Sequence, residues 1–376
     1  MRAIDATSPS GGAKSAVGLV VAPPGPEFEI WRNGVRRRAL DHVADFVDTR
    51  CLPQLERTGV DVAGDVLVGF VDGGKCLRST FMYLGWLCGA DPDDAALRAA
   101  SGLELLHAFA LLQDDIMDDS ALRRGRPAAH VQFGQWHLDR GLSGSPDRFG
   151  ASLAVLLSDL CLVWAEQMMR ESGVGHDALS RAWPHYDAMR IELAVGQCAD
   201  VANDAGAQPD LETVLDVARR KSGNYTVRRP LEIGAAMAGR EPLIDALGDY
   251  GSAVGEAFQM RDDILGVFGS PAVTGKPAGG DLAERKATSV VVAAHRMADS
   301  GIRRQFAELM SAEELTDSDI AHWRTLIVAT GAVDWIEELI AERVATATER
   351  LGDVRIDDWV QSALADMAAV CTLRMT

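Results

Sequence analysis

The chain has 376 residues, of which 47% are hydrophobic and 6% aromatic, and its formal net charge is −18. This negative charge argues against a general binding surface for nucleic acid or for an anionic membrane. The sequence has no run of about 18 apolar residues, so we expect no membrane span. Its N-terminus does not have the pattern of a signal peptide, so we expect none. Abundant Ala and Leu with few aromatic residues favour an all-α fold.

The N-terminal segment differs in composition from the rest of the chain. Residues 1–27 are rich in Ala, Gly, Ser and Pro, so we expect a disordered tail there and a helical domain over residues 28–376. The short apolar patch Ala16–Ala22 could dock on a partner chain, or it could simply be a tolerated terminus. Helical periodicity then begins at Trp31 and continues to Leu55.

The next feature is a turn with two basic residues. Asp72-Gly73-Gly74 is expected to open a helix whose first turn carries Lys75 and Arg78. Backbone N–H groups at a helix start, together with two cations, bind anions well. The alternative to an anion-binding site is an ordinary helix start whose charged side chains are exposed to solvent.

An apolar helix, predicted over residues 95–119, ends in a cluster of carboxylates. Asp114 and Asp118 lie one turn apart on one face, and His107 lies two turns before Asp114 on that face. Paired carboxylates favour a hard cation such as Mg²⁺, which completes its shell with water and phosphate. Arg123 and Arg124 follow and offer forked donors to phosphate oxygens. The cluster predicts a diphosphate site, although a solvated acidic helix end has the same residues.

The second half of the chain repeats this plan. An apolar run from Gly255 ends in Asp262 and Asp263, with Gln259 one turn before Asp263. If the two clusters face each other, they can hold several metal ions around one diphosphate and assist cleavage of a carbon–oxygen bond. Between them, Lys221-Ser222-Gly223 is expected to break or kink a helix and to point its dipoles into the cavity.

A long Gly/Pro loop follows the second cluster, over residues 269–288. It contains Lys276, Asp281 and Lys286, and a loop of this length is often a lid. Closure of such a lid would keep water away from a reactive cation.

These motifs, in this order over residues 35 to 350, resemble those of the trans-isoprenyl diphosphate synthases, or polyprenyl synthetases. The resemblance implies a single-domain, all-α helical bundle around a central cavity, and a homodimer. It implies that isopentenyl diphosphate and an allylic diphosphate bind with three Mg²⁺ ions per active site. The six scattered cysteines fit free thiols in a reducing cytoplasm.

The resemblance also implies roles for individual residues. Lys75, Arg78, His107 and Arg124 would bind isopentenyl diphosphate, and Arg123 the allylic diphosphate, with Lys276 and Lys286 as further substrate ligands. The implied metal ligands are Asp114, Asp115, Asp118, Asp262 and Asp263, and the implied cation-stabilising residues are Lys221, Ser222 and Gln259. Three positions depart from the family pattern: Ser79 replaces Pro, Ser222 replaces Thr, and Gly266 replaces Asp.

Product length should depend on the residues before Asp114. Phe109 and Ala110 lie five and four positions before it, about 6 to 7.5 Å along the helix, and would form the floor of the chain pocket. One aromatic residue at the farther position resembles geranylgeranyl diphosphate synthases, with farnesyl or geranyl diphosphate as alternative products. Phe109 could also be an ordinary core residue.

Two other classes of protein compete with the synthase. A class I terpene cyclase also binds Mg²⁺ through an Asp-rich motif, but it would not need Lys75 and Arg78. A non-catalytic subunit could dock through the N-terminal tail, although such a subunit usually loses one Asp motif and both are present here.

Overall fold

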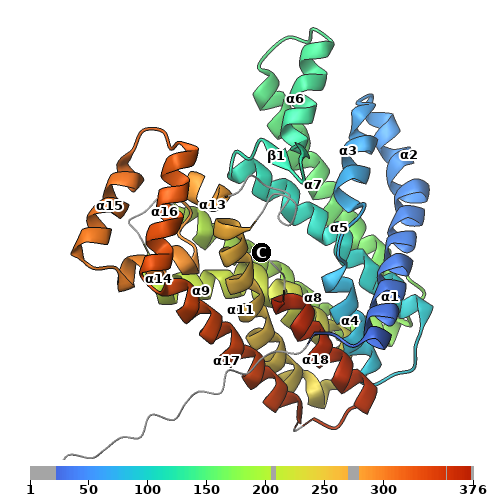
Figure 1. Cartoon of the computed structure of the whole chain (residues 1–376). Coiled ribbons are helices and arrows are strands. Elements are labelled where there is room, and N and C mark those ends of the chain that lie inside the picture. Colours follow the sequence, from blue (N-terminus) through green and yellow to red (C-terminus); the bar gives the residue numbers. More distant parts are fainter. Residues whose placement is uncertain (1–22, 205–208, 270–278, 353, 374–376) are drawn as a thin grey trace, which may run out of the picture.

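α-Helices make up nearly all the regular structure of the computed structural model, which describes residues 23–204, 209–269, 279–352 and 354–373 (Figure 1). The only strands in those ranges are β1 (Leu122–Arg123) and β2 (Arg126–Pro127), a two-residue antiparallel pair. The predicted all-α fold is confirmed.

The α-helices of the first half are α1 (Pro26–Phe46), α2 (Leu52–Leu55), α3 (Val62–Val71), α4 (Leu77–Leu87), α5 (Asp94–Met117), α6 (Ala129–Asp139), α7 (Pro146–Arg170) and α8 (His176–Asp204). Those of the second half are α9 (Leu211–Ala218), α10 (Arg229–Met237), α11 (Ile244–Phe268), α13 (Gly280–Ala283), α14 (Ser289–Met297), α15 (Ser300–Ser311), α16 (Asp317–Ala329), α17 (Ala332–Gly352) and α18 (Asp358–Thr372). Irregular turns are η1 (Val47–Cys51), η2 (Glu56–Thr58), η3 (Arg219–Arg228) and η4 (Glu241–Leu243), of which η1 and η3 are π-helical.

Local sequence explains where several helices begin. Asp93 caps α5 by accepting a hydrogen bond from the backbone N–H of Ala95, and Ser145 caps α7, which has Pro146 in its first turn. Thr316 and Asp319 form a complete capping box at the start of α16. Each cap satisfies backbone donors that the helix itself leaves unpaired.

Two apolar clusters form the core and meet along α4 and α10. One contains Phe81 of α4 and Leu231 of α10 and extends over α11, α14, α17 and α18. The other contains Met82 of α4 and Ile233 of α10 and extends over α1, α3, α5, α7 and α8. Helices α4 and α10 contribute residues to both clusters. They therefore connect the cluster around α5, which carries the first Asp cluster, to the cluster around α11, which carries the second.

The segment η3 is the point where the sequence predicted a broken or kinked helix at Gly223. The chain instead stays helical and widens into a π-helix, a rare form that is frequent at functional sites. A Cβ atom on Gly255 of α11 would lie 2.6 Å from the carbonyl oxygen of Gly223. The two backbones can cross this closely only because both positions are glycine, and the crossing brings Lys221 and Ser222 toward the end of α11.

Some predicted boundaries need correction. Helix α1 begins at Pro26, inside the segment expected to be a tail, while residues 1–22, with the apolar patch Ala16–Ala22, lie outside the described residues. Lys75 lies before α4, which begins at Leu77, because Cys76 takes a left-handed backbone conformation with φ of 49°. The prediction that placed Lys75 on the first helical turn was therefore wrong.

Among the described residues, two helices, α5 and α7, are long and apolar enough to cross a membrane when judged by length and composition alone. In α5, 67% of the most apolar window is buried, so that helix belongs to the protein core. In α7 only 39% of the window is buried, and Leu156 and Val163 are exposed. The absence of a membrane span stays a prediction.

A buried ionic cluster beside η3 leads to a testable effect on stability. Glu232 of α10 is only 2% exposed and accepts hydrogen bonds from Arg228 at 2.7 Å and Arg229 at 2.6 Å. Burial acts to raise the pKa of Glu232, but His185 and these two arginines outweigh it and lower the pKa below its usual 4.5. Glu232→Gln removes the carboxylate that Arg228 and Arg229 share and leaves Arg229 with Glu192 alone, so it should cost about 3 kcal/mol of unfolding free energy at pH 7.

The sign of the pH dependence follows from the lowered pKa. The stabilisation by Glu232 is complete above pH 4.5 and is lost as the pH falls through the lower pKa of the folded state. Urea unfolding should therefore show the variant and the wild type converging in acid. Glu314→Gln, which changes an exposed carboxylate, is the control and should follow the wild type at each pH. Equal stability of wild type and Glu232→Gln at pH 7 would contradict the argument.

Candidate active site

A polar cavity of about 600 Å³ lies between the two Asp clusters. Helix α5 contributes Asp114, and α11 contributes Gln259, Asp262 and Gly266. The structure thus brings the two clusters to one cavity, as the sequence predicted. Its polar lining is completed by Lys75, Asp200, Asn203, Lys221, Ser222, Asp263, Asp281, Lys286 and Thr288.

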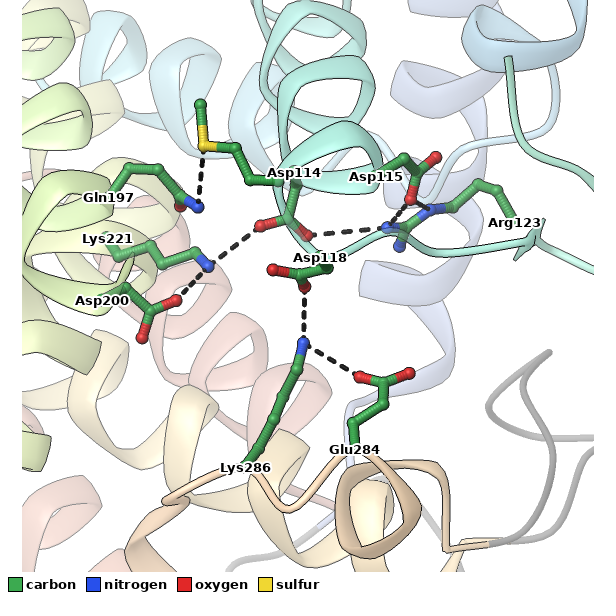
Figure 2. A network of polar contacts seen from close by, with 10 residues as sticks. Asp114, Asp115, Asp118, Arg123, Gln197, Asp200, Lys221, Glu284 and Lys286 are labelled. Carbon is green, nitrogen blue, oxygen red and sulfur yellow. Dashed lines mark hydrogen bonds and ion pairs between the residues drawn. The ribbon is translucent and has the colours of Figure 1, made fainter. Parts of the chain in front are cut away.

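Asp114 stands at the centre of a network of charges, which Figure 2 shows. Its carboxylate lies 2.9 Å from the Lys221 ammonium, which also contacts Asp200 of α8 at 2.5 Å, and it lies 3.6 Å from Arg123. Burial acts to raise the pKa of Asp114, but Lys221 and Arg123 outweigh it, and the pKa is lowered. Asp114 is therefore a carboxylate anion that faces the cavity at neutral pH.

Asp118 lies one turn further along the chain and has a different cation. Lys286, in the turn after α13, places its ammonium 2.6 Å from Asp118 and 3.2 Å from Glu284 (Figure 2). Burial acts to lower the pKa of Lys286, but Asp118 outweighs it and the pKa is raised. The charged Lys286 therefore ties the segment after α13 to the end of α5.

Asp115 does not join Asp114 in the lining of the cavity. It is fully buried and accepts hydrogen bonds from Arg123, whose Nε lies 2.8 Å from it. One residue along an α-helix turns the side chain by about 100°, so Asp115 points away from its neighbour. The prediction that grouped Asp115 with the cavity carboxylates is not supported by this placement, and Arg123 is directed to Asp115 and Asp114.

Asp263 borders the cavity but is engaged by the protein. Its carboxylate accepts hydrogen bonds from the backbone N–H of Ser289 at 2.8 Å, from the Ser289 hydroxyl at 2.6 Å and from Gln259 at 2.8 Å. Burial raises the pKa of Asp263 despite these donors. The arrangement anchors the start of α14 to α11 and orients Gln259.

A second cavity, of about 680 Å³ and mostly apolar, adjoins the first. Phe109 and Ala110 of α5 line it, as do Met117 of α5 and Leu193, Ala194, Cys198 and Val201 of α8. Asp114, Lys221 and Ser222 border both this cavity and the polar one. A ligand with a charged head and an apolar chain could therefore lie across both, with its junction at these three residues.

The predicted anion-binding residues are divided among three cavities. Lys75 borders the polar cavity, while Arg78 and His107 border the apolar one. Arg123 and Arg124 line a third cavity of about 470 Å³, and Lys276 lies outside the described residues. The structure therefore does not gather the proposed isopentenyl diphosphate ligands at one point.

Arg78 and His107 are held in place by packing around Tyr225. The Arg78 guanidinium carbon lies 4.2 Å from the centre of the Tyr225 ring, and Arg78 donates to the hydroxyl of Thr226 at 3.0 Å. Burial and then the charge of Arg78 lower the pKa of His107 well below its usual value, so this imidazole is neutral. The N–H of a neutral imidazole can donate one hydrogen bond to a diphosphate oxygen without adding charge to the site.

Sequence reasoning missed the contribution of α8. Its apolar lining residues Ala194, Cys198 and Val201 recur at helical spacing, a signal that could have identified one face of a wall. Asp200, which binds Lys221, has no such signal because the two residues lie 21 positions apart and meet only through packing.

The carboxylates fit a hard divalent cation that is shared with a ligand. No three Asp, Glu, His or Cys side chains within the described ranges form a ready metal site. Mg²⁺, however, usually takes one or two carboxylates and completes its shell with water and phosphate oxygens. Asp114 and Asp262, on two helices that border one cavity, are a donor set of that kind.

All six cysteines are free in the structure, and five of them are buried, whereas Cys198 of α8 is exposed. Buried positions of this kind are typical of thiols that pack as small apolar groups.

Comparison with known proteins gives consistent matches. A sequence model of the polyprenyl synthetase family matches residues 64–327. The chain is 33% identical to geranylfarnesyl diphosphate synthase of Aeropyrum pernix, over 75% of this chain and 83% of that one. It is 32% identical to geranylgeranyl diphosphate synthase of Mycobacterium tuberculosis, over 76% and 77% of the two chains. The crystal structure of geranylgeranyl pyrophosphate synthase from Corynebacterium glutamicum, complexed with isoprenyl diphosphate and magnesium, superposes with a TM-score of 0.80 at 35% identity, covering 93% of this chain and 98% of that one.

Proposed function

Because this chain belongs to the polyprenyl synthetase family and is a trans-prenyltransferase, we propose that it condenses isopentenyl diphosphate with an allylic diphosphate to form geranylgeranyl diphosphate. The observation that carries the proposal is the junction of the two cavities at Asp114, Lys221 and Ser222. An allylic diphosphate placed there has its charged group among cations and carboxylates and its hydrocarbon chain between α5 and α8. The carbon–oxygen bond to be broken then lies at the boundary between the two cavities.

Carboxylates from both clusters would hold the metal. Asp114, Asp118 and Asp262 are the ligands we propose for three Mg²⁺ ions, which when bound neutralise negative charge on the diphosphate. Asp115 and Asp263 act as positioning residues, since one fixes Arg123 and the other fixes Gln259 and Ser289.

The chain's own residues account for the rest of the reaction. Cleavage of the carbon–oxygen bond leaves an allylic cation, which the Lys221 carbonyl, the Ser222 hydroxyl and the Gln259 side chain stabilise through their dipoles. The double bond of isopentenyl diphosphate forms the new carbon–carbon bond, and the released diphosphate accepts the proton that is then lost. Lys75, Arg78, His107, Arg123, Arg124, Lys276 and Lys286 are the proposed substrate ligands. Because the structure divides these residues among cavities, substrate binding would have to draw them together.

The cavity supports the proposed chain length through its lining. Phe109 and Ala110 border it as the predicted floor requires. The relatives named above make products of different length, so geranyl, farnesyl and longer diphosphates are the competing outcomes.

We also propose that the protein is a homodimer and that it acts in the cytoplasm. Leu156 and Val163 of α7 lie seven residues apart on one face of the helix and are 58% and 57% exposed. A second copy packed on this face would cover them. Light scattering on the purified full chain should give twice the monomer mass, and Leu156→Glu should reduce it.

One assay tests the activity. The protein is incubated with Mg²⁺, labelled isopentenyl diphosphate and, separately, dimethylallyl, geranyl and farnesyl diphosphate, and products are sized by mass spectrometry. We expect a discrete twenty-carbon diphosphate. Hydrocarbons formed without elongation would indicate a terpene cyclase, and no turnover with any primer would indicate a non-catalytic subunit that needs a partner chain.

A further inference from the structure

The turn between α3 and α4, which the sequence identified as an anion-binding segment, is held by two arginines from other parts of the chain. Arg36 of α1 donates from Nε to the Gly74 carbonyl at 2.7 Å and from Nη2 to the Gly73 carbonyl at 3.3 Å. Arg124 donates to the Asp72 carbonyl at 3.0 Å. Three successive carbonyls of this turn are therefore each bonded to a guanidinium group.

The direction of these carbonyls also fixes the direction of the N–H groups that follow them. In a planar trans peptide, the N–H of one residue points opposite to the carbonyl of the residue before it. Because Arg36 holds the Gly73 and Gly74 carbonyls, the N–H groups of Gly74 and Lys75 point away from Arg36. The N–H groups of Gly73 and Gly74 make no hydrogen bond within the described part of the chain. Successive N–H groups that are held in this way form a concave site for an anion.

The two ends of the turn are fixed by the adjacent helices, whereas its middle depends on α1. The Asp72 N–H bonds to a carbonyl of α3 at 2.9 Å, and the Cys76 carbonyl accepts from a backbone N–H of α4 at 2.9 Å. Cys76 has a left-handed backbone with φ of 49°, which is unfavourable for a residue other than glycine and persists only where the surroundings enforce it. Between these ends, Arg36 binds two carbonyls from a position 38 residues before Gly74. Loss of Arg36 should therefore let the middle of the turn relax.

Arg36 is itself fixed in place and carries a charge that no carboxylate neutralises. Val35 and Ala39 beside it on α1 are 4% and 0% exposed and belong to the apolar cluster that extends over α5. Arg32 and Arg38 of the same helix each pair with a carboxylate. Within the described ranges, Arg36 has the two carbonyls as its partners and no ion pair. Its positive charge therefore adds to the attraction of the turn for an anion.

The turn stands between two of the cavities. Gly73 lines the third cavity together with Arg124, while Lys75 borders the polar cavity. A shift of the turn would move its N–H groups and Lys75 relative to a bound diphosphate. Asp114 and Lys221 lie on α5 and η3 and would keep their places. Arg36 should therefore affect one diphosphate substrate and leave the other unchanged.

We propose that Arg36 is a positioning residue for isopentenyl diphosphate. It holds the turn so that its N–H groups and Lys75 face the diphosphate of that substrate, and its charge strengthens the attraction. The inference rests on the proposed function, because isopentenyl diphosphate is a substrate only in that reaction. It adds α1, which lines none of the cavities described above, to the elements that form the site.

The test compares three variants of the full chain. Arg36→Met keeps the length of the side chain but removes its charge and both hydrogen bonds, whereas Arg36→Lys keeps the charge and loses the forked donor. Arg37→Met changes the next residue of α1, which is exposed, and is the control because it alters the net charge equally. For each protein we measure kcat, the KM values for isopentenyl and farnesyl diphosphate, and thermal unfolding. Calorimetric titration with isopentenyl diphosphate alone measures its binding without turnover.

Arg36→Met should raise the KM and the Kd for isopentenyl diphosphate about tenfold, since hydrogen bonds from a charged donor are strong. Its kcat and its KM for farnesyl diphosphate should stay within about twofold of the wild type. Arg36→Lys should show a smaller loss, of about threefold, because it retains the charge. Arg37→Met should match the wild type in every measurement.

The proposal is overturned if Arg36→Met binds isopentenyl diphosphate as Arg37→Met does. It is also overturned if Arg36→Met weakens both substrates equally and unfolds at a lower temperature, since Arg36 would then support the fold in general. A failure of the proposed function looks different, because the wild type would form no elongated product. In that case the titration still shows whether Arg36 contributes to binding of isopentenyl diphosphate.

Discussion

Asp114→Asn should lower prenyl transfer by about a thousandfold or more, equivalent to about 4 kcal/mol of transition-state stabilisation. Asp114 borders both the polar and the apolar cavity, so in the proposed binding mode the breaking carbon–oxygen bond lies beside it. The substitution keeps the size of the side chain but removes the charge that pairs with Lys221 at 2.9 Å. It therefore removes a proposed metal ligand and leaves Asp200 as the remaining ion-pair partner of Lys221.

The control for Asp114→Asn lies in the same run of aspartates. Asp119 is exposed, lines none of the cavities described above, and has a left-handed backbone with φ of 49°, which asparagine tolerates well. Asp119→Asn should keep kcat/KM within about twofold of the wild type, since exposed positions away from the site contribute little. The measurement is kcat/KM for labelled isopentenyl diphosphate at saturating Mg²⁺, with thermal unfolding of each variant. An Asp114→Asn protein that is folded and less than tenfold impaired would contradict the assignment.

The parts of the site that follow from local periodicity could be predicted from the sequence. Asp114 and Asp118 share a helix face because they are four residues apart, and the apolar run before them predicts a buried helix. Asp262 was found because its Asp pair repeats the plan of the first cluster, and the role of Ser222 came from the resemblance of its motif; both border the same cavity.

What could not be predicted depends on contacts between distant segments. Arg123 turns to Asp115 because the helix rotates that carboxylate away from the cavity, and Asp200 meets Lys221 only because α8 packs on η3. Gly266 was identified as a missing carboxylate in the linear motif, and only the structure shows that the Asp281 carboxylate lies beside that position. The sequence identifies which side chains could take part in the site. Which residues those side chains contact depends on how distant segments pack in the tertiary fold.

Phe109→Ala should lengthen the main product by at least one five-carbon unit. The Phe109 ring lines the apolar cavity below Asp114, so its removal extends the space available to the growing chain along α5. Replacing the ring by a methyl group opens space in the cavity wall for the chain to advance, provided that the neighbouring side chains do not collapse into it. Ala110→Phe adds a ring one residue nearer to Asp114 and should shift the product in the opposite direction.

These variants are compared by mass spectrometry of the products formed from farnesyl diphosphate and, separately, from dimethylallyl diphosphate. Phe149→Ala is the matched control: it removes a ring of similar partial burial from α7, where Phe149 stacks on Trp136 away from the cavity. Phe149→Ala should lower the free energy of unfolding by about 3 kcal/mol without changing the length of the product. If Phe109→Ala only destabilises the protein in the same way, then Phe109 is a core residue and the chain length is set elsewhere in the cavity, where Leu193 and Cys198 of α8 form the facing wall.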